Sequence, residues 1–398
     1  ARFCLCFSQV DRSLSTDELQ RYFGVDSYEK APEYEIVYPE VLTADYSKRS
    51  VGRSAIAASS LELQIDVFGQ TLELALEHDD SSIRPGLVAE YVSEEGTITV
   101  PVRTDCLYTG TVRGQSTSLA SVSACAGLIA VINHAAGPTY IEPLDEEHAI
   151  KRDIGRGLPH IAYKRMPDTG ASCPVTSADF VGDVDDDDDK TDDISVQATR
   201  YLELGMVSDF KVYQSKGSNT QTCLTALFNA AKNVLQLNSL DAENSLVVRL
   251  VKITIFTSEA SLATTTDSNY NLDLIADWQR DNNPPSSSVE HWDNSALLTG
   301  YSMGSTLGRA FVGSCGGSSS ASVTSFSHLG VTDTLAHEIG HNLGISHDGG
   351  SNNGCSASKY LMAPHNLGAR SEPIWSTCSK QYYNNFVASV SCYNDFSP

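Results

Sequence analysis

The chain has 398 residues, of which 41% are hydrophobic and 19% are charged, a composition typical of a globular protein with two or three domains. Its formal net charge is −23 at pH 7. A field of this sign repels nucleic acids and anionic membranes, so we expect neither as a partner. No apolar run in the sequence is long enough to span a bilayer.

Ten cysteines are scattered along the chain, and they do not form the paired Cys-x-x-Cys motifs of a zinc ribbon. Scattered cysteines beside loops predict disulfides and an oxidising compartment. We therefore expect a secreted protein. The first residues, ARFCLCFSQVDRS, lack the apolar core of a signal peptide, so we expect that such a peptide has already been removed.

Residues 1–182 are predicted to form mainly β-strands. The clearest predicted strands are Glu35–Tyr38, Leu61–Phe68, Val88–Val92 and Thr97–Val102. Alternating β-branched residues between Cys106 and Ile132 predict a hairpin or meander, which a disulfide from Cys106 to Cys125 is expected to close. No group of side chains in this half has the pattern of a catalytic site.

An acidic run separates the two halves of the chain. Eight aspartates lie between Asp183 and Asp193, in GDVDDDDDKTDD. A block of like charges resists compaction and is typical of an exposed linker. We therefore assign residues 183–194 to a linker, with a second unit at residues 195–398.

Strands and helices are predicted to alternate in the second unit. The predicted strands are Tyr201–Val207, Ser245–Phe256, Ala296–Thr299 and Arg309–Gly313, and the predicted helices are Thr220–Leu237, Asn271–Arg280 and Thr334–Leu343. This alternation favours a mixed α/β layer structure.

The segment HEIGHNLGISHD, in the last of these helices and the loop after it, has the spacing of metal ligands. His337 and His341 are four residues apart, so both imidazoles lie on one face of a helix. Gly344 permits the left-handed turn that ends a helix and lets His347 return as a third ligand. Three imidazoles leave one position open, which is the pattern of a catalytic zinc site. Glu338 projects beside this face and is placed to hold a water rather than the metal.

At these residues the chain resembles the metzincins, whose signature is HExxHxxGxxH followed by a methionine turn, here at Met362. Asp348 and Pro364 are similar to the reprolysin (adamalysin, ADAM-like) branch, as are the stretches RYLELGMVSDF, HWDNSALLTG and TLGRAFVGSC. The resemblance covers roughly residues 195–398. It implies an α/β (α+β) catalytic domain with a mixed twisted sheet and an active-site helix, and it implies a zinc-dependent endopeptidase.

The resemblance also implies roles for individual residues. Glu338 would act as general base and then as proton donor to the leaving amine. Met362 would form a packed floor beneath the metal, and Asp348 would brace the loop that carries His347. Residues Gly308–Gly313 resemble the family's edge strand, along which an extended protein or peptide substrate binds.

Cys173, in KRMPDTGASCPVT, resembles the family's cysteine switch, in which a prodomain thiolate occupies the fourth zinc position. The segment CLYTGTVRG is also similar to reprolysin prodomains. The resemblance implies that residues 1–182 are a prodomain that inhibits the protease. The family usually has Cys-Gly-Val where this chain has Cys-Pro-Val, and a role for Cys173 as a disulfide partner stays open.

The acidic linker contains DDDDK at Asp186–Lys190, which resembles the recognition sequence of enteropeptidase. We expect an activating protease to cut after Lys190. The sequence leaves open whether this site is natural or engineered.

Two further features follow from the family resemblance alone. Reprolysins carry a calcium ion opposite the cleft, and the matching positions here are Glu203, Asp293, Cys392, and Asn394 or Asp395. The implied disulfides are Cys315–Cys392 and Cys355–Cys378.

The alternative class of function is adhesion or ligand binding. An adhesion or binding module can be built on a metalloprotease scaffold whose catalysis is weak or lost. Loss of a histidine ligand or of Glu338 would favour that interpretation, and all four residues are present.

Overall fold

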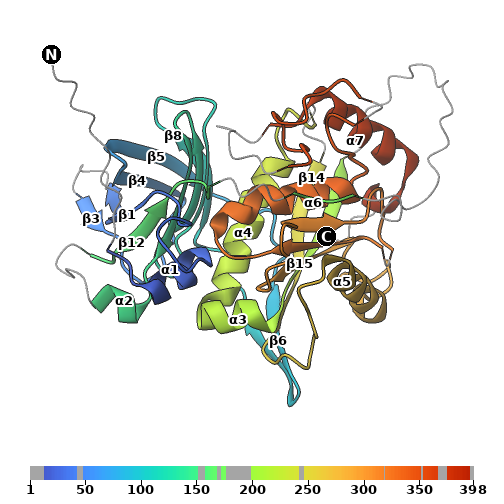
Figure 1. The fold of residues 1–398 in the computed structure, drawn as a ribbon, viewed down its shortest axis with the longest axis horizontal. Coiled ribbons are helices and arrows are strands. Elements are labelled where there is room, and N and C mark those ends of the chain that lie inside the picture. The colour runs from blue at the N-terminus through green and yellow to red at the C-terminus, as the bar shows by residue number, and fades with distance from the viewer. Residues whose placement is uncertain are drawn as a thin grey trace.

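A computed structural model describes residues 13–42, 48–150, 157–167, 172–175, 199–241, 246–317, 319–350, 353–365 and 374–394. These residues build two β-sheets, one of ten strands and one of seven, that lie side by side (Figure 1). The acidic run 183–194, with its expected cleavage site at Lys190, lies outside the described residues, as does Asp395.

The ten-stranded sheet is antiparallel throughout, in the order β1-β12-β11-β10-β9-β8-β5-β4-β2-β3. Its strands are β1 (Tyr34–Val37), β2 (Glu40–Leu42), β3 (Lys48–Ser50), β4 (Ser60–Val67), β5 (Gln70–His78), β8 (Leu107–Val112), β9 (Leu119–Ser123), β10 (Ile129–His134), β11 (Gly137–Pro143) and β12 (His160–Tyr163). Alternate residues of β4 are buried, from Leu61 to Val67, so one face covers a core. The same half of the chain contains two helices, α1 (Thr16–Phe23) and α2 (Glu146–Ile150).

The seven-stranded sheet has the order β16-β17-β15-β13-β14-β6-β7. Its strands from the second half of the chain are β13 (Arg200–Ser208), β14 (Leu246–Phe256), β15 (Asn294–Thr299), β16 (Gly308–Ala310) and β17 (Ala321–Ser325). All of these pair in parallel except β16, an antiparallel edge strand. The mixed α/β layer architecture that the sequence predicts is therefore confirmed.

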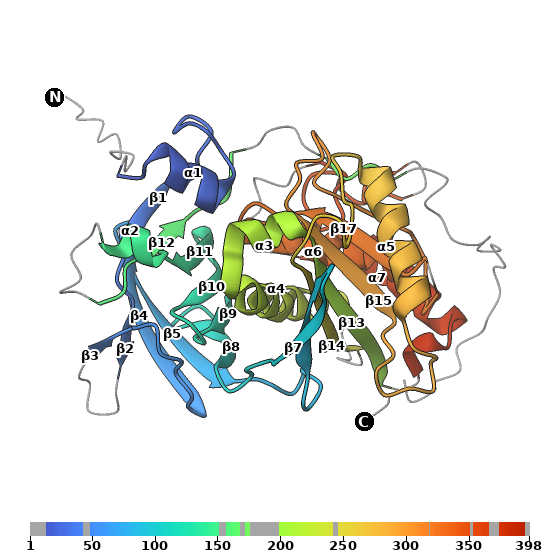
Figure 2. The ribbon, with the colours of Figure 1, turned by 90° about the horizontal axis from the view of Figure 1, so that it is seen from below.

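Helices cover both faces of this sheet. They are α3 (Phe210–Lys216), α4 (Thr220–Leu235), α5 (Ser268–Asn282), α6 (Thr332–Asn342) and α7 (Thr377–Ser389), with 3-10 turns η3 (Gly217–Asn219), η4 (Leu329–Val331) and η5 (Cys392–Asn394). Figure 2 shows α4 between the two sheets and α5 on the opposite face of the seven-stranded sheet. None of the helices in the described part of the chain is both long and apolar enough to cross a membrane.

The hairpin of β6 (Val88–Ser93) and β7 (Gly96–Pro101) lies where the sequence did not predict it. Both strands were expected within a separate β-unit at residues 1–182. Instead, β6 pairs in parallel with β14, and the hairpin extends the second unit's sheet (Figure 1). The free edge of β14 accounts for this placement, because a strand with unpaired backbone groups readily accepts another.

Helix α4 joins the two units. The sequence predicts one apolar side, yet 13 of its 16 residues are buried. Its polar side chains contact the ten-stranded sheet: Asn229 Nδ2 donates to the Tyr108 carbonyl at 3.1 Å, and Lys232 Nζ pairs with Asp79 Oδ2 at 2.5 Å. The first unit therefore covers a face of this helix that would otherwise contact water.

Candidate metal centre

Helix α6 places the first two histidines. Its buried residues Leu335, Ala336 and Ile339 fix one side of the helix against the core, and that leaves the histidine face directed at the cleft. The helix ends at Asn342, and the turn that follows contains Gly344, which has φ +78°. A Cβ added there would lie 2.5 Å from the Phe386 side chain, so both the turn and the packing require glycine.

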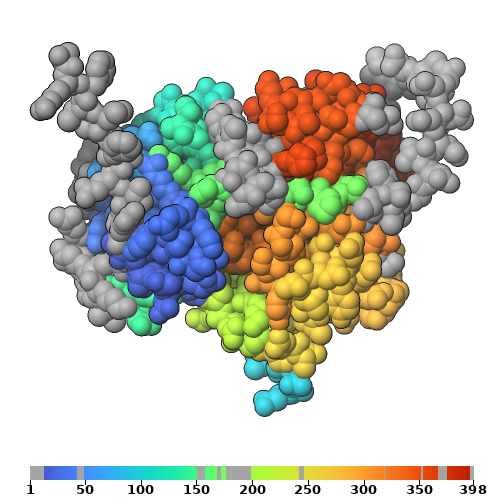
Figure 3. Space-filling model, in the orientation of Figure 1, coloured from blue at the N-terminus to red at the C-terminus, as the bar shows by residue number. Residues whose placement is uncertain are grey.

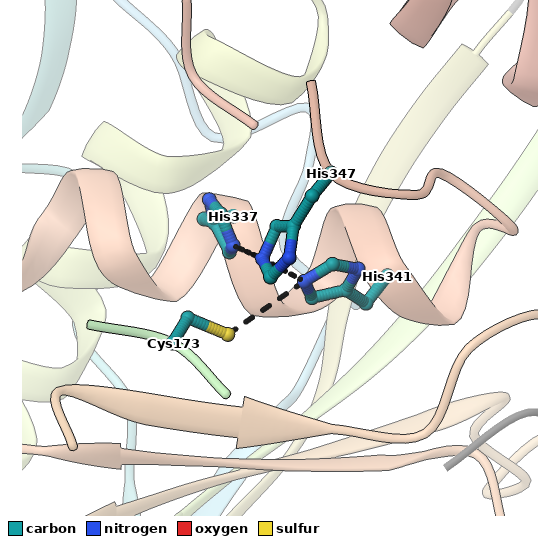
Figure 4. Close-up of side chains that lie close together, drawn as sticks. All are labelled: Cys173, His337, His341 and His347. Carbon is teal, nitrogen blue, oxygen red and sulfur yellow. Dashed lines mark hydrogen bonds between the residues drawn. The ribbon is translucent and has the colours of Figure 1, made fainter. Parts of the chain in front are cut away.

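The three histidine side chains converge after this turn (Figure 4). His337 Nδ1 lies 2.7 Å from the Leu361 carbonyl oxygen, and His341 Nδ1 lies 2.7 Å from that of Ile345. A carbonyl only accepts, so Nδ1 carries the proton in both rings and each Nε2 presents a lone pair. His347 Nε2 lies 3.2 Å from both of these Nε2 atoms.

This donor set fits zinc. Burial lowers the pKa of His341 well below its usual value, and burial lowers the pKa of His347 to about 4, so both rings are neutral at pH 7. Neutral imidazoles whose lone pairs face one point favour a shared cation. Cys173 Sγ completes a group of four potential ligand atoms that lie within 4.8 Å of one another. Three nitrogens and one sulfur are ligands that tetrahedral zinc prefers.

Glu338 lies beside these ligands and is fully buried. Cys173 Sγ lies 3.3 Å from Glu338 Oε2 and 3.6 Å from His341 Nε2, so the thiol occupies the space between the carboxylate and the ring. Sequence patterns missed the role of Gly308, at the start of β16. A Cβ on Gly308 would lie 2.4 Å from Glu338 Oε1, so only glycine leaves room for this carboxylate.

The segment that carries Cys173 is held in the cleft by its backbone. Ser172 N donates to the Ser305 carbonyl at 2.8 Å, and Leu307 N donates to the Ser172 carbonyl at 3.0 Å. On the other side, Cys173 N donates to the Pro364 carbonyl at 3.2 Å. The segment thus bridges both walls of the cleft, and Figure 3 shows this green chain between the red and the orange-yellow parts of the surface. A cavity of about 690 Å³ continues from it along the cleft.

The structure places the other predicted site residues as follows. Met362 is completely buried and packs against Gly340 of α6. Ser376 Oγ donates to Asp348 Oδ1 at 2.5 Å, and Asp348 N donates to the Met362 carbonyl at 2.8 Å. Asp348 therefore ties the loop after His347 to the start of α7.

The expected calcium ligands are brought together only in part. Glu203 and Asp293 are both buried and adjacent: Glu203 N donates to Asp293 Oδ2 at 2.8 Å. Cys392 and Asp293 both lie near Gly316: a Cβ added there would be 3.5 Å from Cys392 Cβ and 4.0 Å from Asp293 Oδ1. Asn394 Oδ1 instead accepts from Arg200 at 2.9 Å.

Three disulfides are present in the described residues, Cys106–Cys125, Cys315–Cys392 and Cys355–Cys378. Cys223 is a buried free thiol, and burial raises its pKa to about 11. Cys173 is also a buried free thiol, with no disulfide to any cysteine among the described residues.

Known proteins resemble this chain over both units. Residues 200–394 match the reprolysin (M12B) family zinc metalloprotease, and residues 35–113 match the reprolysin family propeptide.

Individual relatives agree with these matches. The chain is 27% identical over 378 residues to the zinc metalloproteinase-disintegrin-like atrase-A of Naja atra, an alignment that covers 89% of this chain and 59% of the relative. It is 28% identical over 382 residues to the human a disintegrin and metalloproteinase with thrombospondin motifs 1, with 82% of this chain and 39% of the relative covered. The chain therefore spans less than two thirds of the length of these relatives.

Among solved structures, a metalloproteinase-II from Bacteroides fragilis has a similar fold, with a TM-score of 0.51 at 14% identity. That similarity covers 83% of this chain and 92% of the other. With the propeptide and protease matches in their order along the sequence, this chain belongs to the reprolysin family of zinc metalloproteases.

Proposed function

We propose that this chain is the latent form of a secreted zinc endopeptidase, with a prodomain at residues 1–182, a linker at 183–194 and a protease at 195–398. The observation that carries the proposal is the convergence of three imidazole Nε2 atoms beside a buried glutamate in a cleft. The three disulfides support an extracellular location.

The proposed chemistry is peptide-bond hydrolysis. Zinc held by His337, His341 and His347 would supply a Lewis acid that polarises the scissile carbonyl and lowers the pKa of water. Glu338 then accepts the proton as water attacks, and it passes this proton to the leaving amine. Gly308 keeps the carboxylate of Glu338 in position for both transfers, because no side chain at residue 308 displaces it.

The proposed substrate is an extended stretch of polypeptide. The Cys173 segment already shows that a chain can bond by its backbone to Ser305 and Leu307, just before β16, and to Pro364 on the facing wall. A substrate would use the same backbone groups after this segment leaves. An extended backbone is required, so loops and unfolded segments are the expected cleavage sites.

A peptide-cleavage assay before and after cutting at Lys190 tests the proposal. We expect little cleavage by the uncut chain, cleavage after the cut, and loss of that cleavage when a zinc chelator is added, because the ligand set then holds no Lewis acid. Restoration by added Zn²⁺ is the control. Cleavage that persists at full rate in the chelator would refute a zinc mechanism.

Latency is proposed to rest on two separate contacts. The Cys173 segment fills the cleft, and the β6–β7 hairpin holds the opposite edge of the protease sheet. Thr257 N donates to the Val92 carbonyl at 2.8 Å, and Lys252 Nζ pairs with Glu90 Oε1 at 2.5 Å. Because this hairpin pairs with β14 and not with the cleft, we expect the prodomain to stay bound after the linker is cut.

A proline in β6 tests this anchor. The bond to Val92 shows that Glu90, two residues earlier, also directs its backbone at β14. Glu90→Pro removes a ladder donor, so we expect it to weaken prodomain binding by on the order of tenfold. The measurement is coelution of the two fragments in size-exclusion chromatography after the cut.

Thr99→Pro is the matched control for this variant. Thr99 is opposite Glu90 in the hairpin, so its backbone N–H faces away from both neighbours, and β7 is a sheet edge that tolerates proline. Glu90→Gln separates the loss of the Lys252 ion pair from the loss of the backbone donor. Equal coelution of the two proline variants would show that the hairpin does not anchor the prodomain.

We also propose a calcium site at Glu203 and Asp293, two buried acidic residues that are in contact through the backbone N–H of Glu203 and the carboxylate of Asp293. Added Ca²⁺ is expected to raise the melting temperature by roughly 5 °C at saturation. Asp293→Asn should abolish this shift while Mg²⁺ leaves the wild-type value unchanged. An equal melting temperature with and without Ca²⁺ would count against the site.

A further inference from the structure

The active-site helix carries an acidic residue for which the proposed mechanism has no role. Asp333 lies in the first turn of α6, four residues before His337, so both side chains lie on the same face of the helix. Asp333 lines the cleft cavity together with Thr334, His337 and Glu338. A negative charge in the first turn of a helix interacts favourably with the helix dipole.

A guanidinium forms an ion pair with this carboxylate in the latent chain. Arg165 Nη2 lies 2.7 Å from Asp333 Oδ2, and the two side chains are only 16% and 8% exposed. Arg165 follows β12, so it belongs to the proposed prodomain and would leave the cleft with it. The prodomain thus places a basic side chain on the protease beside the metal ligands.

We propose that Asp333 forms a subsite for a basic side chain of the substrate, and that Arg165 fills this subsite until the prodomain departs. The inference rests on the proposed function, since it assigns a substrate class to the same cleft. The subsite would select a basic over a neutral substrate side chain, because only a basic one can form charge-assisted hydrogen bonds with the Asp333 carboxylate.

The geometry limits where the basic residue lies in the substrate. Four residues of helix separate Asp333 from His337, which is about 6 Å along the helix axis. An extended peptide covers this length in about two residues. The basic side chain therefore lies within about three residues of the scissile bond, allowing for the reach of an arginine side chain.

Two lysines of the protease that lie near Arg165 or Asp333 contact other groups in the latent chain. Lys211 lines the same cavity, but its Nζ lies 3.5 Å from Gln214 Oε1 and above the Tyr301 ring. Lys216 pairs with Glu142 of the prodomain at 2.8 Å, so the prodomain matches an acidic side chain to that lysine and a basic one to Asp333. Lys216 is positive and Asp333 is negative, so we expect only the part of the cleft at Asp333 to prefer a basic side chain.

Peptide scanning tests the subsite by catalysis. A neutral peptide that the cut protease cleaves is remade with arginine, and separately with glutamine, at each of three positions on either side of the cleaved bond. We expect kcat/KM to favour arginine over glutamine at one position by on the order of tenfold. Asp333→Asn should reduce this ratio to about twofold or less, whereas Asp273→Asn, on the exposed surface of α5, should leave it unchanged.

Binding provides a readout that does not depend on turnover. The same arginine and glutamine peptides, carrying a fluorophore, are titrated by anisotropy into zinc-loaded protease with Glu338→Ala. Tighter binding of the arginine peptide that is lost with Asp333→Asn, and reversed in favour of the glutamine peptide with Asp333→Lys, supports the subsite. An arginine-to-glutamine ratio near one at every position, or a ratio that Asp333→Asn does not alter, overturns it. Failure to cleave any peptide would refute the proposed function; in that case, neutral peptides carrying one arginine or one glutamine at each position in turn, titrated in the same way, still decide the subsite.

Discussion

Replacing Glu338 by alanine is expected to lower kcat of the cut protease by roughly 10²–10⁴-fold, because the variant lacks the carboxylate that is proposed to accept the proton from the attacking water. Glu338 is fully buried beside the histidines, and it does not occupy the point at which the three Nε2 atoms converge. The zinc content should therefore be unchanged. The measurements are kcat with a fluorogenic peptide and the zinc-to-protein ratio by elemental analysis.

Glu338→Asp is the informative control for this change. It keeps a carboxylate but withdraws it by one methylene, so its kcat should lie between those of the wild type and the alanine variant. Gly308→Ala should also lower kcat, because the added methyl group would lie against the Glu338 carboxylate. Activity of Glu338→Ala within a few-fold of wild type would mean that a different base carries out the reaction.

The sequence predicted most of this site because its parts lie in one short segment. The two histidines of α6, Glu338, the turn at Gly344 and His347 all fall within eleven residues, so local helix geometry alone determines how they meet. Cys173 is 164 residues before His337, and only the family resemblance linked it to the metal ligands. In the structure its thiol is free, and its Sγ lies 3.6 Å from His341 Nε2.

The contacts between the two units could not be predicted from local patterns. The alternation in β6 and β7 predicts two strands and a turn, but the same alternation is compatible with either sheet. Only the free edge of β14 decides between them. Helix α4 is similar: its Asn229 and Lys232 are polar in sequence, yet they are buried because the ten-stranded sheet supplies their partners.

Contacts between residues that are far apart in the sequence were missed for the same reason. Arg165 and Asp333 are 168 positions apart, and each alone has the pattern of an ordinary surface charge. Gly308 at the start of a strand carries no signal of its own, because its neighbour Glu338 comes from a different element. Such residues become visible only when the fold brings the two segments together.

Cys173→Ala in the uncut chain is expected to raise peptide cleavage by on the order of tenfold, because the fourth ligand position is then open to water. The rise should remain well below the activity of the cut protease. Ser172 would still bond by its backbone to Ser305 and Leu307, and the β6–β7 hairpin would still hold the prodomain. The measurement is the cleavage rate of the uncut variant and of the uncut wild type, each compared with its own cut form.

Alkylation of the thiol separates metal binding from simple burial. If Cys173 binds zinc, a chelator should speed its modification by iodoacetamide, as read by mass spectrometry of the uncut wild-type chain. Cys223 is an internal control: it is buried, its pKa is raised to about 11, and it lies away from the metal ligands, so the chelator should not change its modification. Unchanged latency in Cys173→Ala, together with alkylation of Cys173 that is indifferent to the chelator, would mean that the prodomain inhibits by covering the cleft alone. The backbone bonds of Ser172 would then account for latency, and Cys173 would serve only to fill the space between Glu338 and His341.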